Sequence, residues 1–329
     1  MSVAARTASF WQRYDIRQIE DLQNAVLGAE LEVIQMAGPR VGGSLAFAAR
    51  NGIVYSSGSI DGKVAIRGSL SRDALTIGIA LEVGAGSRHW LNEIQEGDVG
   101  VFLPGGEHDA IYSAGSLYVA ATLTTQRLEE EAARKGVPLQ REMLAKTGLH
   151  ARPIALSELL WIRSQLSQIH AASDTKSHGR DELSEAVLRV ILAHYSRFPQ
   201  IGDGRIAPQG RACIVRRALE YIRENLAQPI PMEVLVRETG TPRRSLYRAF
   251  LEVLEDTPQG FIRRLRLHRI RHELVLGAGT VCGISAIARG WGVGADLGRM
   301  ATRYQSFFGE RPSATLAAHR DRLKSGQWL

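Results

Sequence analysis

The stretch GTPRRSLYRAFLEVL, residues 240–254, decides how the C-terminal part of the chain folds. Its large apolar residues recur at i, i+4, i+7 and i+8, which places them on one stripe of an α-helix. They are Leu246, Phe250, Val253 and Leu254. Arg244, Tyr247 and Arg248 are spaced at i, i+3 and i+4 and share a different face. The stretch therefore predicts an amphipathic helix with a buried apolar side and a basic outer side.

A shorter helix is predicted immediately before this one, over PMEVLVRE, residues 231–238. Gly240 falls in the turn between the two helices. A helix, a glycine-containing turn and a second helix with a basic surface are typical of the helix-turn-helix arrangement, whose second helix enters the major groove of DNA. An ordinary hairpin of two helices with a charged surface would give the same local pattern.

An internal repeat favours the DNA-binding interpretation. EVLVRETG, residues 233–240, aligns with SAIARGWG, residues 285–292, with apolar residues on apolar residues and glycine on glycine. In both copies an aromatic residue then precedes a proline by eight residues, as Phe250 with Pro258 and Tyr304 with Pro312. The sequence therefore predicts two copies of one motif, about fifty residues apart.

Two Thr-Pro pairs mark the expected starts of helices in this region. Thr241 precedes Pro242, and Thr257 precedes Pro258. A threonine N-cap satisfies one free backbone N–H, and proline at the first helical position removes another. We expect both threonines to cap the helices that follow them.

The repeat also accounts for the glycine-rich stretch WGVGADLGRM, residues 291–300. A dinucleotide-binding loop needs a β-strand before its glycines and a βαβ unit around them. The preceding GISAIARG is helical in pattern, and no βαβ pattern surrounds it. We therefore expect these glycines to form the turn of the second helix-turn-helix unit.

Charge is unevenly distributed along the chain. Residues 211–329 contain 20 Lys and Arg against 11 Asp and Glu, whereas residues 1–210 contain 21 against 23. Nineteen of the 20 C-terminal cations are arginine, whose planar guanidinium suits bidentate contact with phosphate or guanine. A solvated basic surface is the alternative, but the clustering indicates a nucleic-acid partner.

These motifs resemble the AraC/XylS family of bacterial transcription regulators. The resemblance covers residues 211–320 and rests on GTPRRSLYRAF, TPQGFIRRLRLHRIRHELV, IARGWG and FFGERPS. It implies two helix-turn-helix units, at about 231–254 and 283–308, joined by a long helix over 258–276. It also implies that their recognition helices enter successive major grooves on one face of double-stranded DNA.

The resemblance assigns base-reading positions in each recognition helix. In the first helix Arg244, Tyr247 and Arg248 are expected to reach bases, assisted by Arg243 and Ser245. In the second helix the matching positions are Gly298, Arg299 and Thr302, with Arg303 beside them. Glycine has no side chain to read a base, so Arg299 would carry most of that readout. Five arginines also lie along the joining helix, and we expect most to be solvated or ion-paired and one or two to contact phosphates. They are Arg263, Arg264, Arg266, Arg269 and Arg271.

The second unit departs from the family pattern. Gly240 and Phe250 are ten positions apart, whereas Gly292 and Tyr304 are twelve apart, where the family usually has eleven. Val293 and Met300 stand where the family usually has aromatic residues, which predicts weaker packing of the second recognition helix. We expect Gly294 and Ala295 to absorb the additional residue and Asp296 to cap the helix.

The N-terminal part alternates in β-fashion over residues 52–124 and turns helical over 126–198. Two apolar helical faces are predicted there, Leu159, Ile162, Leu166 and Ile169 on one helix and Leu183, Val187, Val190 and Ile191 on the next. A Gly- and Pro-containing stretch, residues 198–210, then reads as a linker.

The expected architecture is a two-domain α+β fold. It has an N-terminal cupin-like antiparallel β-barrel with following helices, residues 1–200, and a linker, residues 201–210. An all-α domain with two helix-turn-helix units, residues 211–329, completes the chain. We expect the first domain to sense an effector and to mediate dimerisation through the apolar faces of its helices.

The cupin comparison rests on EGDVGVFLPGGEHDAIY, residues 96–112, which resembles the second conserved motif of cupin-like barrels. Metal-binding cupins need further histidines and a glutamate, and this chain offers His89, Glu93 and His108 without a His-x-His pair. A metal-dependent cupin enzyme fused to the DNA-binding domain is the alternative function. A histidine after a Gly-Gly turn is more often a turn or surface residue, so we expect an organic effector of unknown identity, no metal and no cofactor.

No other constellation in the sequence indicates an enzyme. Cys213 and Cys282, the two cysteines, fit neither a disulfide framework nor a zinc site, and neither lies in the N-terminal half, where alkyl-transfer repair would need one. No Ser/His/Asp set, P-loop or paired carboxylates stand out, so no catalytic residue is assigned. We expect a cytoplasmic regulator without a membrane segment. Its expected partners are DNA, an effector, a second copy of the chain and RNA polymerase.

Overall fold

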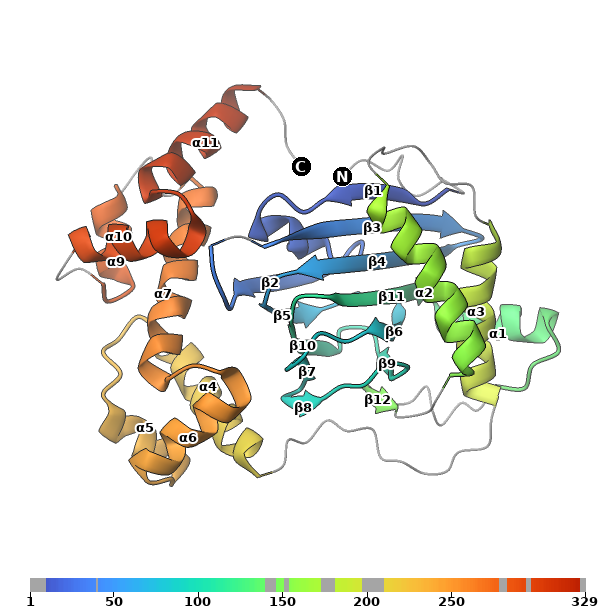
Figure 1. The fold of residues 1–329 in the computed structure, drawn as a ribbon, viewed down its shortest axis with the longest axis horizontal. Coiled ribbons are helices and arrows are strands. Elements are labelled where there is room, and N and C mark those ends of the chain that lie inside the picture. Colours follow the sequence, from blue (N-terminus) through green and yellow to red (C-terminus); the bar gives the residue numbers. More distant parts are fainter. Residues whose placement is uncertain are drawn as a thin grey trace. The chain divides into compact units, whose positions relative to one another are not determined.

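The computed structural model describes residues 10–39, 41–139, 146–150, 154–172, 181–196, 210–277, 283–293 and 297–325, the side chains of 319–325 excepted. The chain divides into two compact units, Met1–Gln35 with Val41–Ile206 and Met36–Arg40 with Ala207–Leu329. In the described residues the first unit contains all the strands, and the second consists of helices (Figure 1). This confirms the two-domain α+β architecture.

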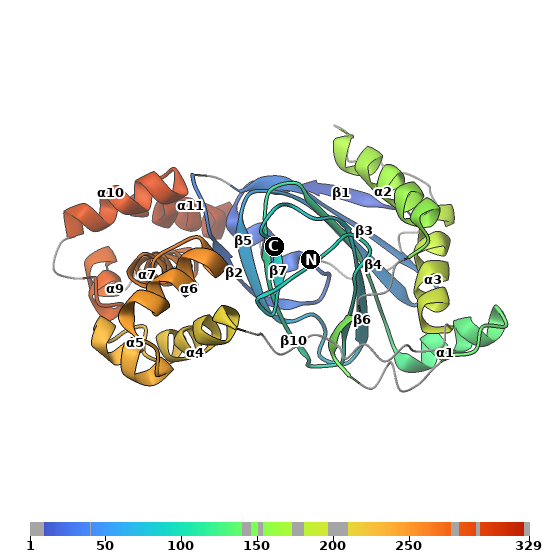
Figure 2. The same cartoon turned by 60° about the horizontal axis from the view of Figure 1, so that its bottom comes forward.

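The strands of the first unit form two antiparallel sheets. The seven-stranded sheet has the order β1-β3-β4-β11-β6-β9-β12, and the five-stranded sheet has the order β2-β5-β10-β7-β8. The first sheet comprises β1 (Gln12–Asp15), β3 (Gly42–Arg50), β4 (Ile53–Asp61), β11 (Ser116–Leu123), β6 (Leu75–Glu82), β9 (Val99–Phe102) and β12 (Gly148–His150). The second comprises β2 (Glu30–Gln35), β5 (Val64–Ser69), β10 (Glu107–Tyr112), β7 (Arg88–His89) and β8 (Asn92–Glu93). The two sheets face each other (Figure 2) but are not joined by strand pairing in the described residues, so they do not close into one continuous barrel.

The β-structure begins earlier than the alternation predicted. Strands β1, β2 and β3 all precede residue 52, the expected start. Strand β3 reads GGSLAFAAR, in which alanines replace the polar residues of a half-exposed strand because both of its faces are covered. A short 3-10 helix, η2 (Ile19–Asn24), lies against β2 and packs its Ile19 and Leu22 into the core between the sheets.

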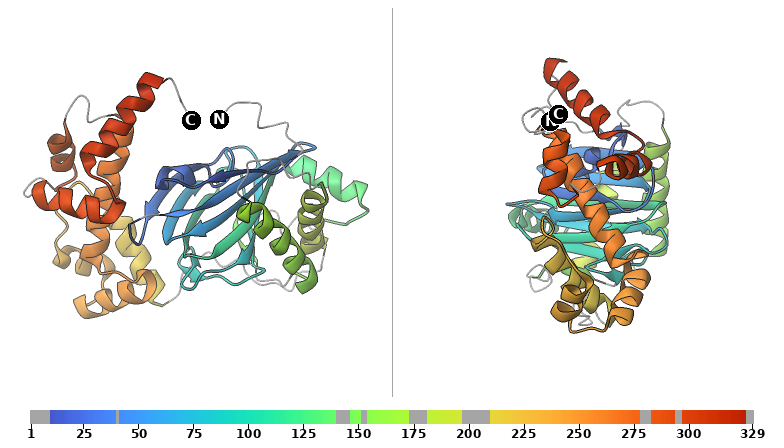
Figure 3. Two further views of the ribbon diagram at one scale, coloured as in Figure 1. Left: turned by 45° about the horizontal axis from the view of Figure 1, so that its top comes forward. Right: turned by 90° about the vertical axis from the view of Figure 1, so that its left-hand side faces the viewer.

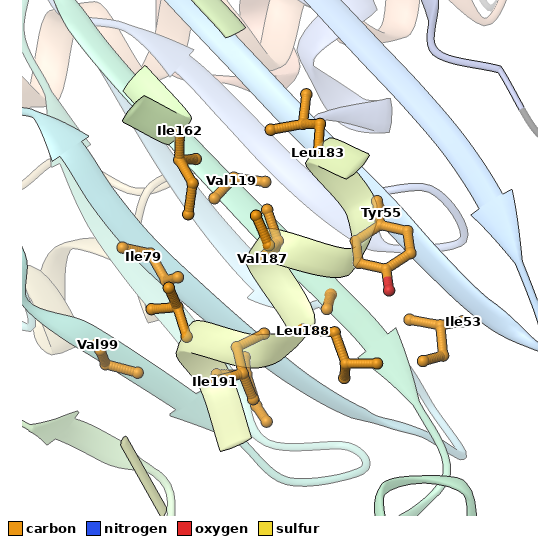
Figure 4. Close-up of a cluster of buried hydrophobic side chains, with 14 of the residues drawn as sticks. Ile53, Tyr55, Ile79, Val99, Val119, Ile162, Leu183, Val187, Leu188 and Ile191 are labelled. Carbon is orange, nitrogen blue, oxygen red and sulfur yellow. The ribbon is translucent and has the colours of Figure 1, made fainter. Parts of the chain in front are cut away.

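Two helices cover the outer face of the seven-stranded sheet, α2 (Leu156–Ala171) and α3 (Asp181–Ser196). Both apolar faces predicted from the sequence are buried there. Figure 4 shows Leu183, Val187, Leu188 and Ile191 of α3 lying over side chains of the sheet. Burying each such side chain contributes about 1.5–3 kcal/mol, so these helices are part of the domain core. A third helix, α1 (Thr125–Arg134), follows β11 directly.

A buried histidine anchors the C-terminal end of α2 to the sheet. Nδ1 of His170 lies 2.7 Å from Oγ of Ser44, and Nε2 lies 2.9 Å from Oγ of Ser57. Because the Ser57 hydroxyl donates to the carbonyl of Tyr118, its oxygen is left to accept from Nε2–H of His170. Burial lowers the pKa of His170 to about 4, so the ring is neutral at pH 7.

The second unit contains α4 (Arg211–Glu224), α5 (Met232–Thr239), α6 (Arg243–Leu254), α7 (Pro258–Val275), α9 (Ile284–Gly290), α10 (Leu297–Phe308) and α11 (Pro312–Ser325). Helix α7 runs through this unit, between the α4–α6 group and the α9–α11 group (Figure 3). Its N-terminal half packs Phe261 edge-to-face on Phe250 of α6. Its C-terminal half packs Leu267, Ile270 and Leu274 against α9 and α10. The joining helix thus belongs to two small cores.

No helix among the described residues combines the length and the apolar character needed to cross a membrane.

Candidate nucleic-acid interface and ligand cavity

The first turn of the repeat is built on a left-handed glycine. Gly240 ends α5 with φ +62°, a conformation that glycine adopts without a steric penalty. Its N–H donates to the carbonyl of Arg237 at 3.2 Å, and the N–H of Thr241 donates to the carbonyl of Val236 at 3.2 Å. These two bonds close the last turn of α5 and direct the chain into α6.

The predicted threonine cap is wrong at Thr241 and confirmed at Thr257. Helix α6 begins at Arg243, one residue later than expected, so Pro242 occupies the N-cap position with ψ 144°. The side chain of Thr241 is buried and donates back to a carbonyl in the last turn of α5 at 3.2 Å. Oγ1 of Thr257 accepts the N–H of Gly260 at 3.0 Å, as an N-cap should.

Helix α6 has a clean division between its two faces. The buried residues are Leu246, Ala249, Phe250, Val253 and Leu254. Of the predicted base-reading residues, Arg243, Arg244, Ser245 and Arg248 are exposed and Tyr247 is half-buried. The guanidinium of Arg243 lies 5.8 Å from the centre of the Tyr247 ring. Among the described residues Arg244 and Arg248 have no ion-pair or hydrogen-bond partner, so their charges face solvent.

The second turn has the same left-handed glycine and the same pair of backbone hydrogen bonds as the first. Gly292 has φ +70°, and its N–H donates to the carbonyl of Arg289 at 3.0 Å. The N–H of Val293 donates to the carbonyl of Ala288 at 2.9 Å, which is the same pair of bonds as in the first turn. Ile284–Gly290 is helix α9, so Gly292 follows a helix and not the strand that a dinucleotide-binding loop requires.

Helix α10 starts at Leu297 and presents the remaining predicted residues on its outer side. Gly298, Arg299, Thr302 and Arg303 are all exposed. The hydroxyl of Thr302 donates to the carbonyl of Gly298 at 3.1 Å, so part of its hydrogen-bonding capacity is used within the helix. The buried side consists of Met300, Tyr304 and Phe308. The expected roles of Gly294, Ala295 and Asp296 lie outside the described residues, as does Cys282.

Four of the five arginines on α7 have partners within the helical unit. Arg264 pairs with Asp256 at 3.0 Å, and Arg271, which is buried, pairs with Glu310 at 2.6 Å. Arg266 donates to the carbonyls of Leu226 and Gln228, and Arg269 lies over the Trp291 ring. The fifth, Arg263, is exposed. Most of these arginines therefore stabilise the protein itself.

The N-terminal unit contains a cavity of about 70 Å³ between the two sheets. Small residues on the inner face of the seven-stranded sheet leave this space, namely Gly78, Ala80, Gly100 and Ala120. Aromatic rings line it as well, namely His89, Phe102, His108, Tyr112 and Tyr118. By comparison one water needs about 10–15 Å³, so the cavity has room for a small molecule.

The two histidines of this cavity are buried, contrary to the expectation that His108 lies in a turn or on the surface. The pairing of β10 with β7 brings them together, and their ring centres are 4.7 Å apart. Burial lowers the pKa of His89 well below its usual range, with a smaller contribution from His108. Burial likewise lowers the pKa of His108 to about 4. Both rings are therefore neutral at pH 7.

Glu93 does not join the two histidines. It lies on β8 opposite Arg88, is exposed, and pairs with that arginine at 3.2 Å. Residues 88 and 89 point to opposite faces of the sheet, so Glu93 shares the face of Arg88 and not that of His89. The described residues contain no cluster of three or more His, Cys, Asp or Glu that could hold a metal ion.

Sequence reasoning missed Phe102, Tyr112 and Tyr118 as cavity residues. They lie on β9, β10 and β11, which do not pair with one another, and only the packing of the two sheets face to face brings them together. The sequence signal that could have indicated the cavity is the small side chains at Gly78 and Ala80 of β6 and at Gly100 of β9. A filled core would have larger side chains at these positions.

Comparisons with known proteins agree with the geometry of the helical unit. A family model described as "Helix-turn-helix domain" matches residues 235–318. The XylDLEGF operon transcriptional activator 2 of Pseudomonas putida is 34% identical over 112 residues, which is 34% of this chain and 70% of that relative. The probable thc operon regulatory protein of Rhodococcus erythropolis is 32% identical over 103 residues, 31% of each chain.

A solved structure is also similar to part of the chain. The probable AraC family transcriptional regulator from Rhodopseudomonas palustris is 35% identical, and the match covers 32% of this chain and 96% of that chain with a TM-score of 0.31. The similarity to the Pseudomonas putida activator, of which the match covers 70%, and the duplicated helix-turn-helix unit lead to one conclusion. The chain belongs to the AraC/XylS family of DNA-binding transcription regulators.

Proposed function

We propose that the chain reads a specific DNA sequence mainly through α6, with Arg244, Tyr247 and Arg248 at the bases and Arg243 and Ser245 assisting. The observation that supports this most is the solvent-facing side of α6. Arg244 and Arg248 have no partner in the part of the chain that the structure describes, so no ion pair there has to be broken before they bind guanine or phosphate. The firmly packed opposite face holds α6 in place, which reduces the entropy lost on binding.

The second recognition helix contributes differently. We propose that Arg299, Thr302 and Arg303 of α10 bind mainly phosphates, because Gly298 presents no side chain and the hydroxyl of Thr302 is engaged within the helix. Phosphate contacts fix the position of the protein on the duplex but carry little sequence information. Exposed Arg263 on α7 is a further candidate for such a contact.

Selection from random duplexes with the full chain tests this proposal. The wild-type chain should enrich one sequence, and Arg244→Ala should lose preference at one base position of it. Arg72→Ala is the matched control, because it removes the same charge from an exposed site in the N-terminal unit. Failure to enrich any sequence, or equal effects of the two substitutions, would contradict the proposal.

We propose that the N-terminal unit is a cupin-like sensing domain that binds an organic effector in the cavity between its sheets. The cavity, the partly apolar lining and the two neutral histidines support this role. The metal-dependent cupin enzyme is not favoured, because Glu93 pairs with Arg88 away from the histidines. We assign no reaction to the chain.

We propose that the chain dimerises through an exposed part of α2. The apolar faces first expected to mediate this contact are buried against the chain's own sheet and cannot serve. On the opposite side of α2, Leu156, Leu160 and Trp161 are 68%, 49% and 39% exposed. Contiguous exposed apolar residues favour a protein contact. Leu160→Glu should convert a dimer into a monomer at micromolar concentration, whereas Leu276→Glu, at an exposed leucine of the helical unit, should not. A monomeric wild-type chain would contradict the proposal.

The location and the remaining partner follow from the family. We propose that the regulator acts in the cytoplasm at the nucleoid and that RNA polymerase is its partner at promoters. A pull-down of RNA polymerase by the DNA-bound chain tests the second point, and recovery that does not depend on the chain would contradict it.

A further inference from the structure

One wall of the cavity in the N-terminal unit is a series of aromatic rings, each in contact with the next. Neighbouring ring centres lie 5.3 Å apart for His89 and Phe102 and 5.4 Å apart for Phe102 and His108. The series continues at 6.2 Å to Tyr112 and 5.9 Å to Tyr118, both in stacked arrangements. Aromatic rings prefer stacked or edge-to-face contact at such distances, so the wall offers favourable surfaces to a further flat ring.

Most polar groups in this wall already have partners. The hydroxyl of Tyr118 donates to the carbonyl of Ala25 at 2.6 Å. The hydroxyl of Tyr112 lies 3.2 Å from Nε2 of His108. A carboxylate oxygen of Asp98 accepts the N–H of Gln95 at 2.9 Å. These groups are therefore engaged within the protein.

Two ring nitrogens are different, Nε2 of His89 and Nδ1 of His108, which are buried without a hydrogen-bond partner in the described part of the chain. Burial lowers the pKa of His108 against an opposing effect of the backbone of Ile66, whereas no hydrogen bond affects the pKa of His89, which is 4% exposed. A buried polar atom without a partner costs about 1–3 kcal/mol, and such atoms are rare in native proteins. A ligand group that bonds to Nε2 would remove this cost. The position of His89 in the cavity lining makes that bond accessible to a bound molecule.

The cavity has no positive charge to offer a ligand. No lysine or arginine is among the described residues that line it, and Asp98 is its carboxylate. The neutral state of both histidines agrees with this, as do the pKa values of Tyr112 and Tyr118, which desolvation raises. An anionic ligand would lose its hydration without gaining a counter-charge, which is strongly unfavourable. A ligand that fits is uncharged.

We propose that this cavity binds a small uncharged molecule with one flat apolar ring and one hydroxyl group, a phenol in its simplest form, whose hydroxyl bonds to Nε2 of His89. A hydroxyl both donates and accepts, so it pairs with Nε2 in either tautomer of the neutral imidazole. The ring lies against Phe102 and the tyrosines, and Gly78 and Gly100 provide the space. The inference rests on the proposed sensing role and adds the class of ligand to it.

Calorimetric titration of the full chain with five probes tests the proposal. Phenol and benzyl alcohol carry the ring and the hydroxyl, toluene lacks the hydroxyl, benzoate is an anion, and benzyltrimethylammonium is a cation. We expect saturable one-to-one binding of phenol or benzyl alcohol, weaker binding of toluene, and no binding of the two ions. Tighter binding of either ion than of both alcohols would overturn the ligand class.

Two variants locate the binding. His89→Phe keeps a ring but removes Nε2, and it should weaken phenol binding roughly tenfold while leaving toluene unchanged. Gly78→Val fills the cavity and should abolish binding of both. The added Cβ has space, since the nearest atoms are 3.9 Å away, and the thermal transition of each variant checks that it folds.

The outcomes separate two failures. Binding of an ion that Gly78→Val abolishes would retain the sensing cavity but overturn the ligand class. Binding of phenol that is unaffected by both His89→Phe and Gly78→Val would overturn the proposed site. If none of the five probes binds the wild-type chain, the ligand class fails. DNA binding by the wild-type chain and by Gly78→Val is then compared with and without a small-molecule cell extract. An extract that changes DNA binding of the wild-type chain alone would retain the sensing role, and equal responses of the two chains would overturn it.

Discussion

The two helix-turn-helix units share the same turn conformation and differ in the length of the connection between their helices. Gly240 and Gly292 are both left-handed and are followed by the same pair of turn hydrogen bonds. Three residues then separate α5 from α6, whereas six separate α9 from α10. Duplication has thus preserved the turn glycine and the helix before it, while the approach to the second recognition helix has lengthened.

The packing of the two recognition helices also differs. Helix α6 buries five side chains, and α10 buries three. Both helices are twelve residues long, so the difference lies in the side chains and not in helix length. Helix α6 is firmly held, and its Arg244 and Arg248 have no partner among the described residues. This difference is the basis for proposing that the first copy reads the sequence and that the second supports it.

The largest expected effect is the loss of packing beneath α6. Phe250 is fully buried and contacts Phe261 of α7, so Phe250→Ala should destabilise the helical unit by about 3–5 kcal/mol. Met300→Ala in α10 should cost less, about 2–3 kcal/mol, since the methionine side chain is smaller than that of phenylalanine and leaves a smaller cavity. Urea unfolding of both variants measures the difference. A larger loss for Met300→Ala would break the comparison of the two helices.

The two turn glycines should differ by a smaller amount. Alanine in a left-handed conformation costs roughly 1–2 kcal/mol at either position. A Cβ on Gly240 would meet nothing within 4 Å, whereas a Cβ on Gly292 would lie 3.3 Å from the carbonyl oxygen of Ala227 and 3.3 Å from Cζ of Arg266. Gly292→Ala should therefore lower the thermal transition more than Gly240→Ala. Equal shifts would show that the neighbours of Gly292 yield without cost.

The smallest expected effect distinguishes the two threonines at helix starts. Thr257→Ala removes a true N-cap and should cost about 1 kcal/mol, and Thr257→Ser should restore most of it. Thr241→Ser keeps the hydroxyl that donates to the end of α5 and should be nearly neutral. Chemical denaturation of the three variants provides the values. A cost for Thr241→Ser above that of Thr257→Ala would contradict the assignment of the caps.

Much of the helical unit could be predicted because its signals are local. The spacing of Leu246, Phe250 and Val253 and the turn at Gly240 are readable within one helix and its neighbour. The wrong cap at Thr241 is a shift of one residue, which sequence patterns rarely resolve. The cavity could not be predicted in the same way. His89 and His108 are 19 positions apart and become neighbours only through the register of β7 and β10.

The dimerisation surface illustrates a second limit. An apolar stripe such as Leu159, Ile162 and Leu166 shows that one helical face is buried but not what buries it. From the sequence we expected a second copy of the chain to cover this face. The sheet covers it, and the exposed candidates Leu160 and Trp161 lie where periodicity predicted no burial.

The most direct test of the two roles compares Arg244→Ala with Arg299→Ala on the preferred DNA site and on sites mutated in one half at a time. Arg244→Ala should cost roughly 1–3 kcal/mol and abolish discrimination at one base position. Arg299→Ala should weaken binding to all sites about equally and reduce the salt dependence by about one counterion. Loss of base preference from Arg299→Ala that equals or exceeds the loss from Arg244→Ala would contradict the division of roles.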